Sequence, residues 1–281
     1  MSDDIKTRFI DELLNDLEQD KLVLPTLPEV ALKVRDTLEN EDTSMREVAE
    51  AISTDAALSA RMIQVANSPL MRATRQIESV EAAVTRMGSN MIRNLVTSMV
   101  MEQMFQATSD ATDKRLRAVW EHSVQVAAIS HALASQFTKL APEQAMLAGL
   151  VHDIGTLPIL THAEDRPELL ANEAMLDAII RETHTRIGGA ILEKWSFPAD
   201  LVACAAEHED LGRSHDGAAD YTDVVMVANL QSHLGSDHPL TAVDWGSVSA
   251  FSRVGLEVDV NVVEMDETSA DIEAVRSVLT H

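Results

Sequence analysis

The chain is poor in basic residues, and this shortage excludes several classes of partner. Of its 281 residues, 22 are lysine or arginine and 46 are aspartate or glutamate, so the net charge is −24. Binding to a phosphate backbone needs a positive surface, and we therefore expect no direct nucleic-acid partner and no membrane partner. The single cysteine, Cys204, excludes an intrachain disulfide and favours a reducing, cytoplasmic location.

Glycine, proline and aromatic residues are also scarce. The chain has 10 glycines and 8 prolines, and aromatic residues make up 3% of it, whereas hydrophobic residues make up 46%. The core must therefore be built from alanine, leucine, valine, isoleucine and the 13 methionines, which is typical of an all-α protein. No apolar run approaches the roughly 20 residues of a membrane span, and the first residues do not have the pattern of a signal peptide.

Apolar spacing and capping residues predict the helices. Residues 1–22 have the spacing of an amphipathic helix, and Pro25 and Pro28 interrupt the chain after it. Ser44 and Glu47 fit a capping box at the start of another helix. Residues 53–55, which end in Asp55, are expected to cap the next helix, and Ser79 to start the one after it. Later helices are expected over about 113–137, from 142 to 152, and over about 167–182, 184–195, 198–208 and 218–234. Residues 258–262 alternate in a way that predicts a short extended segment.

The same pattern divides the chain into three parts. A polar stretch near residue 108 separates an N-terminal helical lobe, residues 1–108, from a helical core, residues 109–240. Residues 241–281 form an acidic C-terminal extension. From residue 257 onward it holds seven acidic residues and one basic residue, Arg276, so we interpret its end as a solvated helix.

The adjacent His152 and Asp153 are the most informative pair of residues. They follow an apolar run that begins near residue 145, so their side chains are expected to be buried. An imidazole and a carboxylate are costly to bury without partners. Either a metal ion or a network of hydrogen bonds could satisfy them, and the pair alone does not decide between the two.

Four ordered motifs together resemble those of the HDOD family. They are LPTLP at residues 24–28, DAALSARMIQVANSP at 55–69, IESVEAAVTRMG at 77–88 and HDIG at 152–155. The family is a bacterial signalling branch related to HD and HD-GYP metal-dependent phosphohydrolases. The resemblance covers about residues 20–235. It implies an all-α bundle of two lobes, in which family-specific N-terminal helices precede an HD-like helical core.

The resemblance also implies a metal site. The positions that match its ligands are His122, His152, Asp153, His184 and His208, and Asn229 stands where catalytic relatives have an aspartate. Imidazole and carboxylate ligands suit Fe, Mn, Zn or Ni. Because an amide is a weaker ligand than a carboxylate, the site could equally stay metal-free, as a buried polar network left from an ancestral centre.

Two functions follow from this resemblance. The first is a regulatory protein that acts without turnover, by binding a signalling partner either alone or together with a nucleotide. Because helices fill the chain, we expect its receiver, kinase or cyclase partners to be separate proteins. The alternative is a metal-dependent phosphohydrolase that acts on a nucleotide or a cyclic dinucleotide, so whether the chain is an enzyme stays open.

A local excess of arginine suggests a second site. Residues 61–93 carry five arginines against two glutamates, a net charge of +3 within an acidic chain. The arginines are Arg61, Arg72, Arg75, Arg86 and Arg93. They either form salt bridges with acidic neighbours or bind an acidic partner or anion through their planar guanidinium groups. Among the remaining histidines, His233 and His238 lie near predicted helix ends and are expected to be solvated.

Overall fold

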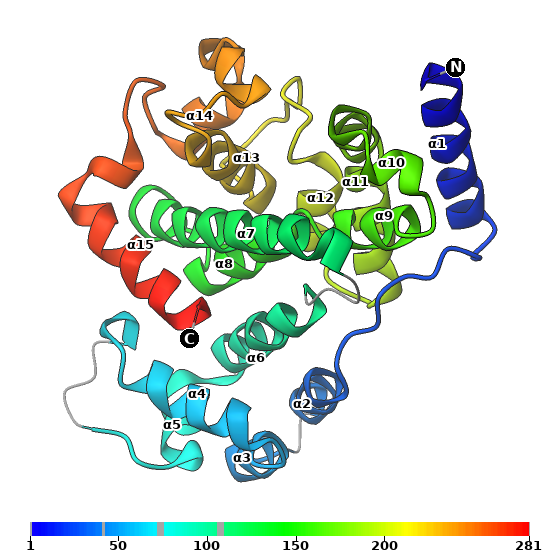
Figure 1. Cartoon of the computed structure of the whole chain (residues 1–281). Coiled ribbons are helices and arrows are strands. Elements are labelled where there is room, and N and C mark those ends of the chain that lie inside the picture. The colour runs from blue at the N-terminus through cyan, green and yellow to red at the C-terminus, as the bar shows by residue number, and fades with distance from the viewer. Residues whose placement is uncertain (1, 41–42, 72–75, 106–109, 281) are drawn as a thin grey trace.

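The computed structural model describes residues 2–40, 43–71, 76–105 and 110–280, and within these ranges it contains helices and no strand. This confirms the prediction of an all-α fold. The lower lobe in Figure 1 consists of α2 (Glu29–Glu39), α3 (Met45–Ile52), α4 (Ala56–Ala66), α5 (Val80–Met87) and α6 (Ser89–Met104). No helix in the described ranges is both long enough and apolar enough to span a bilayer.

The upper lobe is built around the longest helix, α7, which crosses the middle of the molecule (Figure 1). Its helices are α7 (Asp110–Phe137), α8 (Pro142–Val151), α9 (Thr156–Ala163), α10 (Pro167–Leu170), α11 (Glu173–Lys194), α12 (Ala199–Glu207), α13 (Tyr221–Ser232), α14 (Ser249–Val254) and α15 (Asp266–Leu279). Helix α8 packs closely along α7. A Cβ at Gly149 would lie 2.8 Å from the Ala127 Cα, so only glycine permits this approach.

The predicted capping residues begin the helices of the lower lobe. Ser44 and Glu47 form a complete capping box at α3. The Asp55 side chain accepts a hydrogen bond from the Leu58 N–H at the start of α4, and Ser79 does the same for Ala82 at α5. Gly88, with a φ of 76°, separates α5 from α6. These caps satisfy N–H groups that a helix leaves without partners in its first turn.

Three local predictions were wrong. Helix α11 runs without a break through residues 183 and 184, where two separate helices were expected. Residues 258–262 form no extended segment, because a turn there leads into a 3₁₀ helix at Val262–Glu264. The terminal helix α15 is not merely solvated, since it packs on α7 and buries Val275 and Leu279 completely or nearly so.

Helix α1 (Ser2–Glu18) lies against the upper lobe and is separated from α2 by an extended stretch (Figure 1). Arg186 of α11 forms an ion pair with Glu18 at 2.6 Å, and Lys6 pairs with Glu182 of the same helix. The division at residue 108 stays a prediction. In space, however, the first helix contacts the core that this division assigns to residues 109–240.

Candidate metal centre

The structure brings together the five residues that match the ligands of the related hydrolases. His122 lies in the middle of α7, His152 and Asp153 follow α8, His184 lies in the middle of α11, and His208 follows α12. Every imidazole presents its Nε2 atom to the Asp153 carboxylate. His122 and His152 lie 3.7 and 3.4 Å from Oδ2, whereas His184 and His208 lie 3.4 and 3.3 Å from Oδ1.

Backbone carbonyls orient three of these imidazoles. His152 Nδ1 lies 2.6 Å from the Gly149 oxygen, His184 Nδ1 lies 2.8 Å from that of Ile180, and His208 Nδ1 lies 3.0 Å from that of Cys204. A carbonyl oxygen only accepts hydrogen bonds, so each Nδ1 must carry a proton and donate it. When neutral, these rings therefore direct an Nε2 lone pair toward the carboxylate, as metal-binding histidines do.

In this arrangement the Nε2 lone pairs of the imidazoles face the carboxylate oxygens of Asp153, and both kinds of atom are hydrogen-bond acceptors. His152 Nε2 is fully buried and has no hydrogen-bond partner within the described ranges. His184 Nε2 and His208 Nε2 lie 3.3 Å apart. A proton on His208 would satisfy one side of Asp153 but would leave His152 without a partner. Cations on both sides of the carboxylate satisfy every lone pair, so the donor set fits metal ions better than a network of hydrogen bonds alone.

The charges in the cluster shift its pKa values. Burial works to raise the pKa of Asp153, but the neighbouring imidazoles of His152, His208 and His184 hold it well below its usual range. Burial lowers the pKa of His152 to about 3, so this ring is neutral at physiological pH. For His208, the hydrogen bond and charge of Asp153 outweigh burial and raise the pKa. Asp153 therefore carries the negative charge, and at least one imidazole is available as a neutral ligand.

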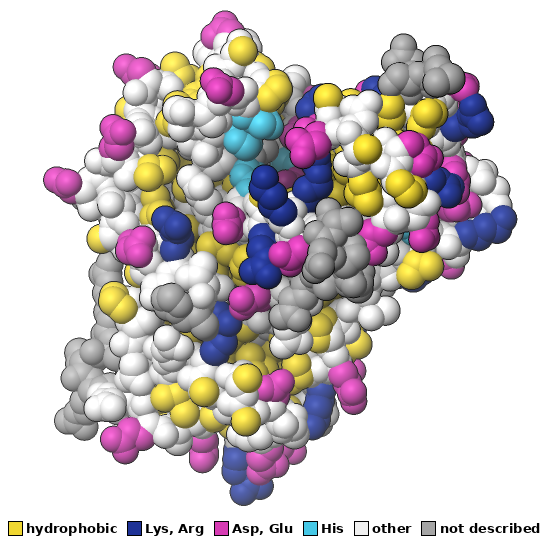
Figure 2. All heavy atoms as spheres, in the orientation of Figure 1, with side chains coloured by type: hydrophobic (Ala, Val, Ile, Leu, Met, Phe, Trp, Pro, Cys, Tyr) yellow, Lys and Arg dark blue, Asp and Glu magenta, His cyan; other side chains and the backbone are white. Residues whose placement is uncertain are grey.

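The cluster opens into a cavity of about 240 Å³, which we call the central hollow. The hollow is lined by Ala118, Val119, His122, Asp153, Ile180, Arg181, His184, Glu209, Asn229, His233 and His238. Figure 2 shows histidine side chains exposed in the upper part of this face, with basic and acidic side chains next to them. Asn229 lies where the sequence placed it, and its buried Oδ1 has no hydrogen-bond partner in the part of the chain that is described.

Four polar residues of the central hollow were not identified as site residues from the sequence: Arg181, Glu209, His233 and His238. His233 and His238 were expected to be solvated, and the structure leaves both of them only partly exposed. The two rings stack with centroids 3.7 Å apart, and His233 stacks on His122 at 4.9 Å. Arg181 lies three residues before His184, which places both on one face of a helix. This spacing could have identified Arg181 from the sequence. The position of residues 233–238 against α7 could not be identified in this way, because it depends on tertiary structure.

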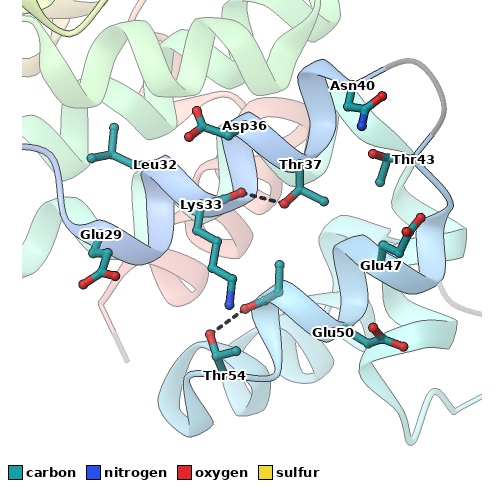
Figure 3. Close-up of a pocket in the computed structure, with 11 residues that line it drawn as sticks. Glu29, Leu32, Lys33, Asp36, Thr37, Asn40, Thr43, Glu47, Glu50 and Thr54 are labelled. Carbon is teal, nitrogen blue, oxygen red and sulfur yellow. Dashed lines mark hydrogen bonds between the residues drawn. The ribbon is translucent and has the colours of Figure 1, made fainter.

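Two other features look like sites but have structural explanations. His215, Asp220 and Asp223 cluster closely, yet Asp223 is 2.6 Å from Arg253, so a guanidinium group already supplies the cation. A wider hollow of about 820 Å³ lies between α2 and α3, and Figure 3 shows mostly polar and acidic side chains around it. No histidine lines this hollow, and its Glu47 belongs to the capping box of α3.

The described members of the arginine group make contacts within the chain. Arg61 donates to Glu102 at 3.0 Å and to the Val278 carbonyl at 2.9 Å, and Arg86 donates to the Met71 carbonyl at 2.9 Å. The Nε atom of Arg93 is buried and has no hydrogen-bond partner among the residues described. Arg72 and Arg75 lie outside the described residues. A docking surface for an acidic partner here stays a prediction.

Comparison with known proteins places this geometry in a family. A protein from Shewanella amazonensis SB2B, provisionally named a metal-dependent phosphohydrolase, is 32% identical with a TM-score of 0.86, over 98% of this chain and 99% of its own. An HDOD domain protein of unknown function from Geobacter sulfurreducens is 23% identical, with a TM-score of 0.64 over 99% of this chain and 100% of its own, and shares the fold.

A curated relative extends beyond the region it shares with this chain. An uncharacterized protein of Treponema pallidum (strain Nichols) is 24% identical over an alignment of 224 residues, which covers 74% of this chain but 42% of the relative. The model of the HDOD domain matches residues 24–211. This match covers more than half of the chain and includes the His152–Asp153 pair, so the chain belongs to the HDOD family.

Proposed function

We propose that the chain is an HDOD signalling protein that holds two metal ions on Asp153 and binds a phosphorylated ligand beside them. The observation that carries this proposal is the convergence of four imidazole Nε2 atoms on the two oxygens of one carboxylate. His122 and His152 would hold a metal on the Oδ2 side, and His184 and His208 would hold one on the Oδ1 side. Fe, Mn, Zn and Ni suit this ligand set.

The central hollow supports an anionic ligand. When bound, metal ions in such a site neutralise phosphate oxygens and lower the pKa of a coordinated water. Arg181 adds a positive charge at the rim, and it forms no ion pair or side-chain hydrogen bond with any other described residue. At about 240 Å³ the hollow is smaller than the roughly 300–1,000 Å³ typical of small-molecule sites. We therefore propose that it encloses a phosphate group while the rest of a nucleotide lies outside.

Regulation of a separate receiver, kinase or cyclase protein is the preferred output. Asn229 supports it, because a neutral amide occupies the position where catalytic relatives supply a carboxylate. Loss of that negative charge weakens metal retention and slows turnover, so binding rather than hydrolysis becomes the useful event. The ligand would change which partner surface the protein presents.

Metal-dependent phosphohydrolysis is the second candidate. It is favoured because His122 and Asp153 keep 22% and 19% of their side-chain surface exposed, which leaves the ligands accessible from the central hollow. An accessible coordination position is what distinguishes catalytic sites from structural ones. The name given to the Shewanella relative agrees with this candidate.

One pair of experiments separates the candidates. Calorimetric titration of metal-loaded protein with nucleotides and cyclic dinucleotides should show binding that is lost in His152→Ala and weakened about tenfold or more in Arg181→Ala. Arg186→Ala, which removes an exposed arginine from the same helix, should bind normally. Hydrolysis should be slow in the wild type and faster in Asn229→Asp. If no nucleotide or cyclic dinucleotide in the panel binds, the preferred proposal is contradicted. Rapid hydrolysis by the wild type would establish the second candidate.

A further inference from the structure

Glu209 is a carboxylate in the central hollow that the ligand pattern of the related hydrolases did not identify. It follows His208 directly after the end of α12, and its Oε2 lies 3.9 Å from His184 Nε2. Its side chain is 27% exposed. No arginine or lysine lies within ion-pairing distance of it in the described ranges, so its charge has no partner except the imidazoles of the cluster.

The distance from Glu209 to His184 places this carboxylate beside the donors on the Oδ1 side. Ligand atoms about 2.1 Å from a shared ion lie roughly 3–4 Å from one another. Asp153 Oδ1 lies 3.4 Å from His184 Nε2 and 3.3 Å from His208 Nε2, and Glu209 Oε2 lies 3.9 Å from the first of these imidazoles. Asp153, His184 and His208 supply three donor atoms within 4.8 Å of one another, and Glu209 lies at the edge of this group, where rotation of its partly exposed side chain would add a fourth.

The charge of the centre favours a second carboxylate. Two divalent ions would bring four positive charges, and Asp153 supplies one negative charge while Asn229 supplies none. A buried excess of positive charge is strongly unfavourable. The nearby Glu207 cannot relieve it, because Arg213 lies 2.8 Å from its Oε2. Glu209 is the neighbouring carboxylate that both lines the hollow and lacks a basic partner among the described residues.

We propose that Glu209 is a metal ligand on the Oδ1 side of Asp153, and that it supplies the negative charge which Asn229 does not. This inference rests on the proposed metal centre. It predicts that the two metal positions depend on different residues. Metal binding at the position formed by His184, His208 and Glu209 requires the Glu209 carboxylate. Metal binding at the position formed by His122 and His152 does not.

Titration of chelator-treated protein with Mn²⁺ or Zn²⁺, followed by calorimetry and elemental analysis, tests this inference. The wild type should bind two equivalents. Glu209→Gln should retain the first and bind the second more than tenfold more weakly, because even indirect partners of a ligand change affinity by about 10–100-fold. Glu207→Gln, with the same charge change at a carboxylate paired to Arg213, should match the wild type. Circular dichroism melting should show that both variants fold.

The outcomes distinguish this inference from the proposed function. Two tight equivalents in Glu209→Gln would overturn the role of Glu209 and leave the metal centre intact. A wild type that binds no metal would overturn both. Loss of both equivalents in folded Glu209→Gln would also overturn the inference, because the two positions would then not be independent.

Discussion

At the scale of single residues, Gly155 determines how closely Asp153 approaches His184. A Cβ at this position would lie 1.9 Å from the His184 carbonyl oxygen and 2.6 Å from the Gly188 nitrogen. Backbone atoms cannot move aside as the end of a side chain can. The glycine of the HDIG motif therefore lets the chain that follows Asp153 pack directly on α11.

Gly155→Ala should force this chain away from α11 and separate Asp153 from His184. We expect a loss of about 1–3 kcal/mol in the free energy of unfolding, as in overpacked cores, together with weaker metal binding on the Oδ1 side. Gly188→Ala is the matched control, because its Cβ would lie 3.4 Å from the Ala205 Cβ, an ordinary contact. Chemical denaturation and metal titration measure both effects. Equal stability and metal affinity in the two variants would contradict this role for Gly155.

The candidate ligands were predicted from motifs, but four polar neighbours of the site were not. His152 and Asp153 could be identified because their motif is contiguous in sequence. His233 and His238 could not, because nothing local indicates that the segment after α13 returns to stack against His122 on α7. Glu209 was adjacent to a predicted ligand but resembled an ordinary surface carboxylate at the end of a helix.

At the scale of helices, Asp223 joins α13 to α14 and to the loop before it. Its carboxylate is fully buried, and it accepts hydrogen bonds from Arg253 at 2.6 and 2.9 Å and from His215 at 3.0 Å. Arg213 approaches it at 3.3 Å. Burial works to raise the pKa of Asp223, but these hydrogen bonds lower it below its usual value.

Asp223→Asn should destabilise the protein by about 3 kcal/mol, because it leaves the largely buried Arg253 without its counter-charge, whereas Arg213 keeps Glu207 and Asp220. Asp216→Asn, an exposed change in the same loop, should have little effect. Urea denaturation measures the difference. Similar stability of the two variants would show that the Asp223 ion pairs do not hold α13 and α14 together.

The lowered pKa also fixes the sign of a pH effect. A carboxylate with a lower pKa in the folded state stabilises the protein above its unfolded pKa of about 4, and this stabilisation is lost as pH falls through the folded value. The free energy of unfolding of the wild type should therefore fall below about pH 4, and the fall should be smaller in Asp223→Asn. An equally steep fall in both proteins would assign the acid sensitivity to other carboxylates.

Helix boundaries show what sequence patterns resolve. Capping residues predicted the starts of α3, α4 and α5, because a side chain and the N–H group it satisfies are only three residues apart. The break expected at residue 183 was wrong, because Thr183 and His184 interrupt the apolar pattern but are buried by contacts with other helices. A polar pair in a helix interior was mistaken for a helix end.

At the scale of the whole molecule, hydrogen bonds join the two lobes near the end of α11. Arg35 of α2 donates to the Trp195 carbonyl at 2.7 Å, and Trp195 Nε1 donates to the Pro25 carbonyl at 3.0 Å. Pro25 belongs to the LPTLP motif, and Trp195 follows the helix that carries His184. The lower lobe is therefore in direct contact with a helix that carries a candidate metal ligand.

Arg35→Ala should loosen this contact. We expect a loss of about 1–2 kcal/mol in the free energy of unfolding and faster hydrogen exchange at α2 and at the end of α11, but not at α13. Arg46→Ala is the control, because the ion pair of Arg46 with Glu50 spans 3.6 Å and is exposed, and such pairs contribute little. Indistinguishable exchange patterns would indicate that the lobes are held together elsewhere.

The measurement that tests the central claim most directly is the metal content of the protein purified without a chelator, determined by elemental mass spectrometry. The wild type should contain about two equivalents of Fe, Mn, Zn or Ni per chain. Asp153→Ala should contain little or none, because all four imidazoles converge on this carboxylate. His162→Ala, which removes a histidine outside the central hollow, should match the wild type. Equal metal content in wild type and Asp153→Ala would contradict the account.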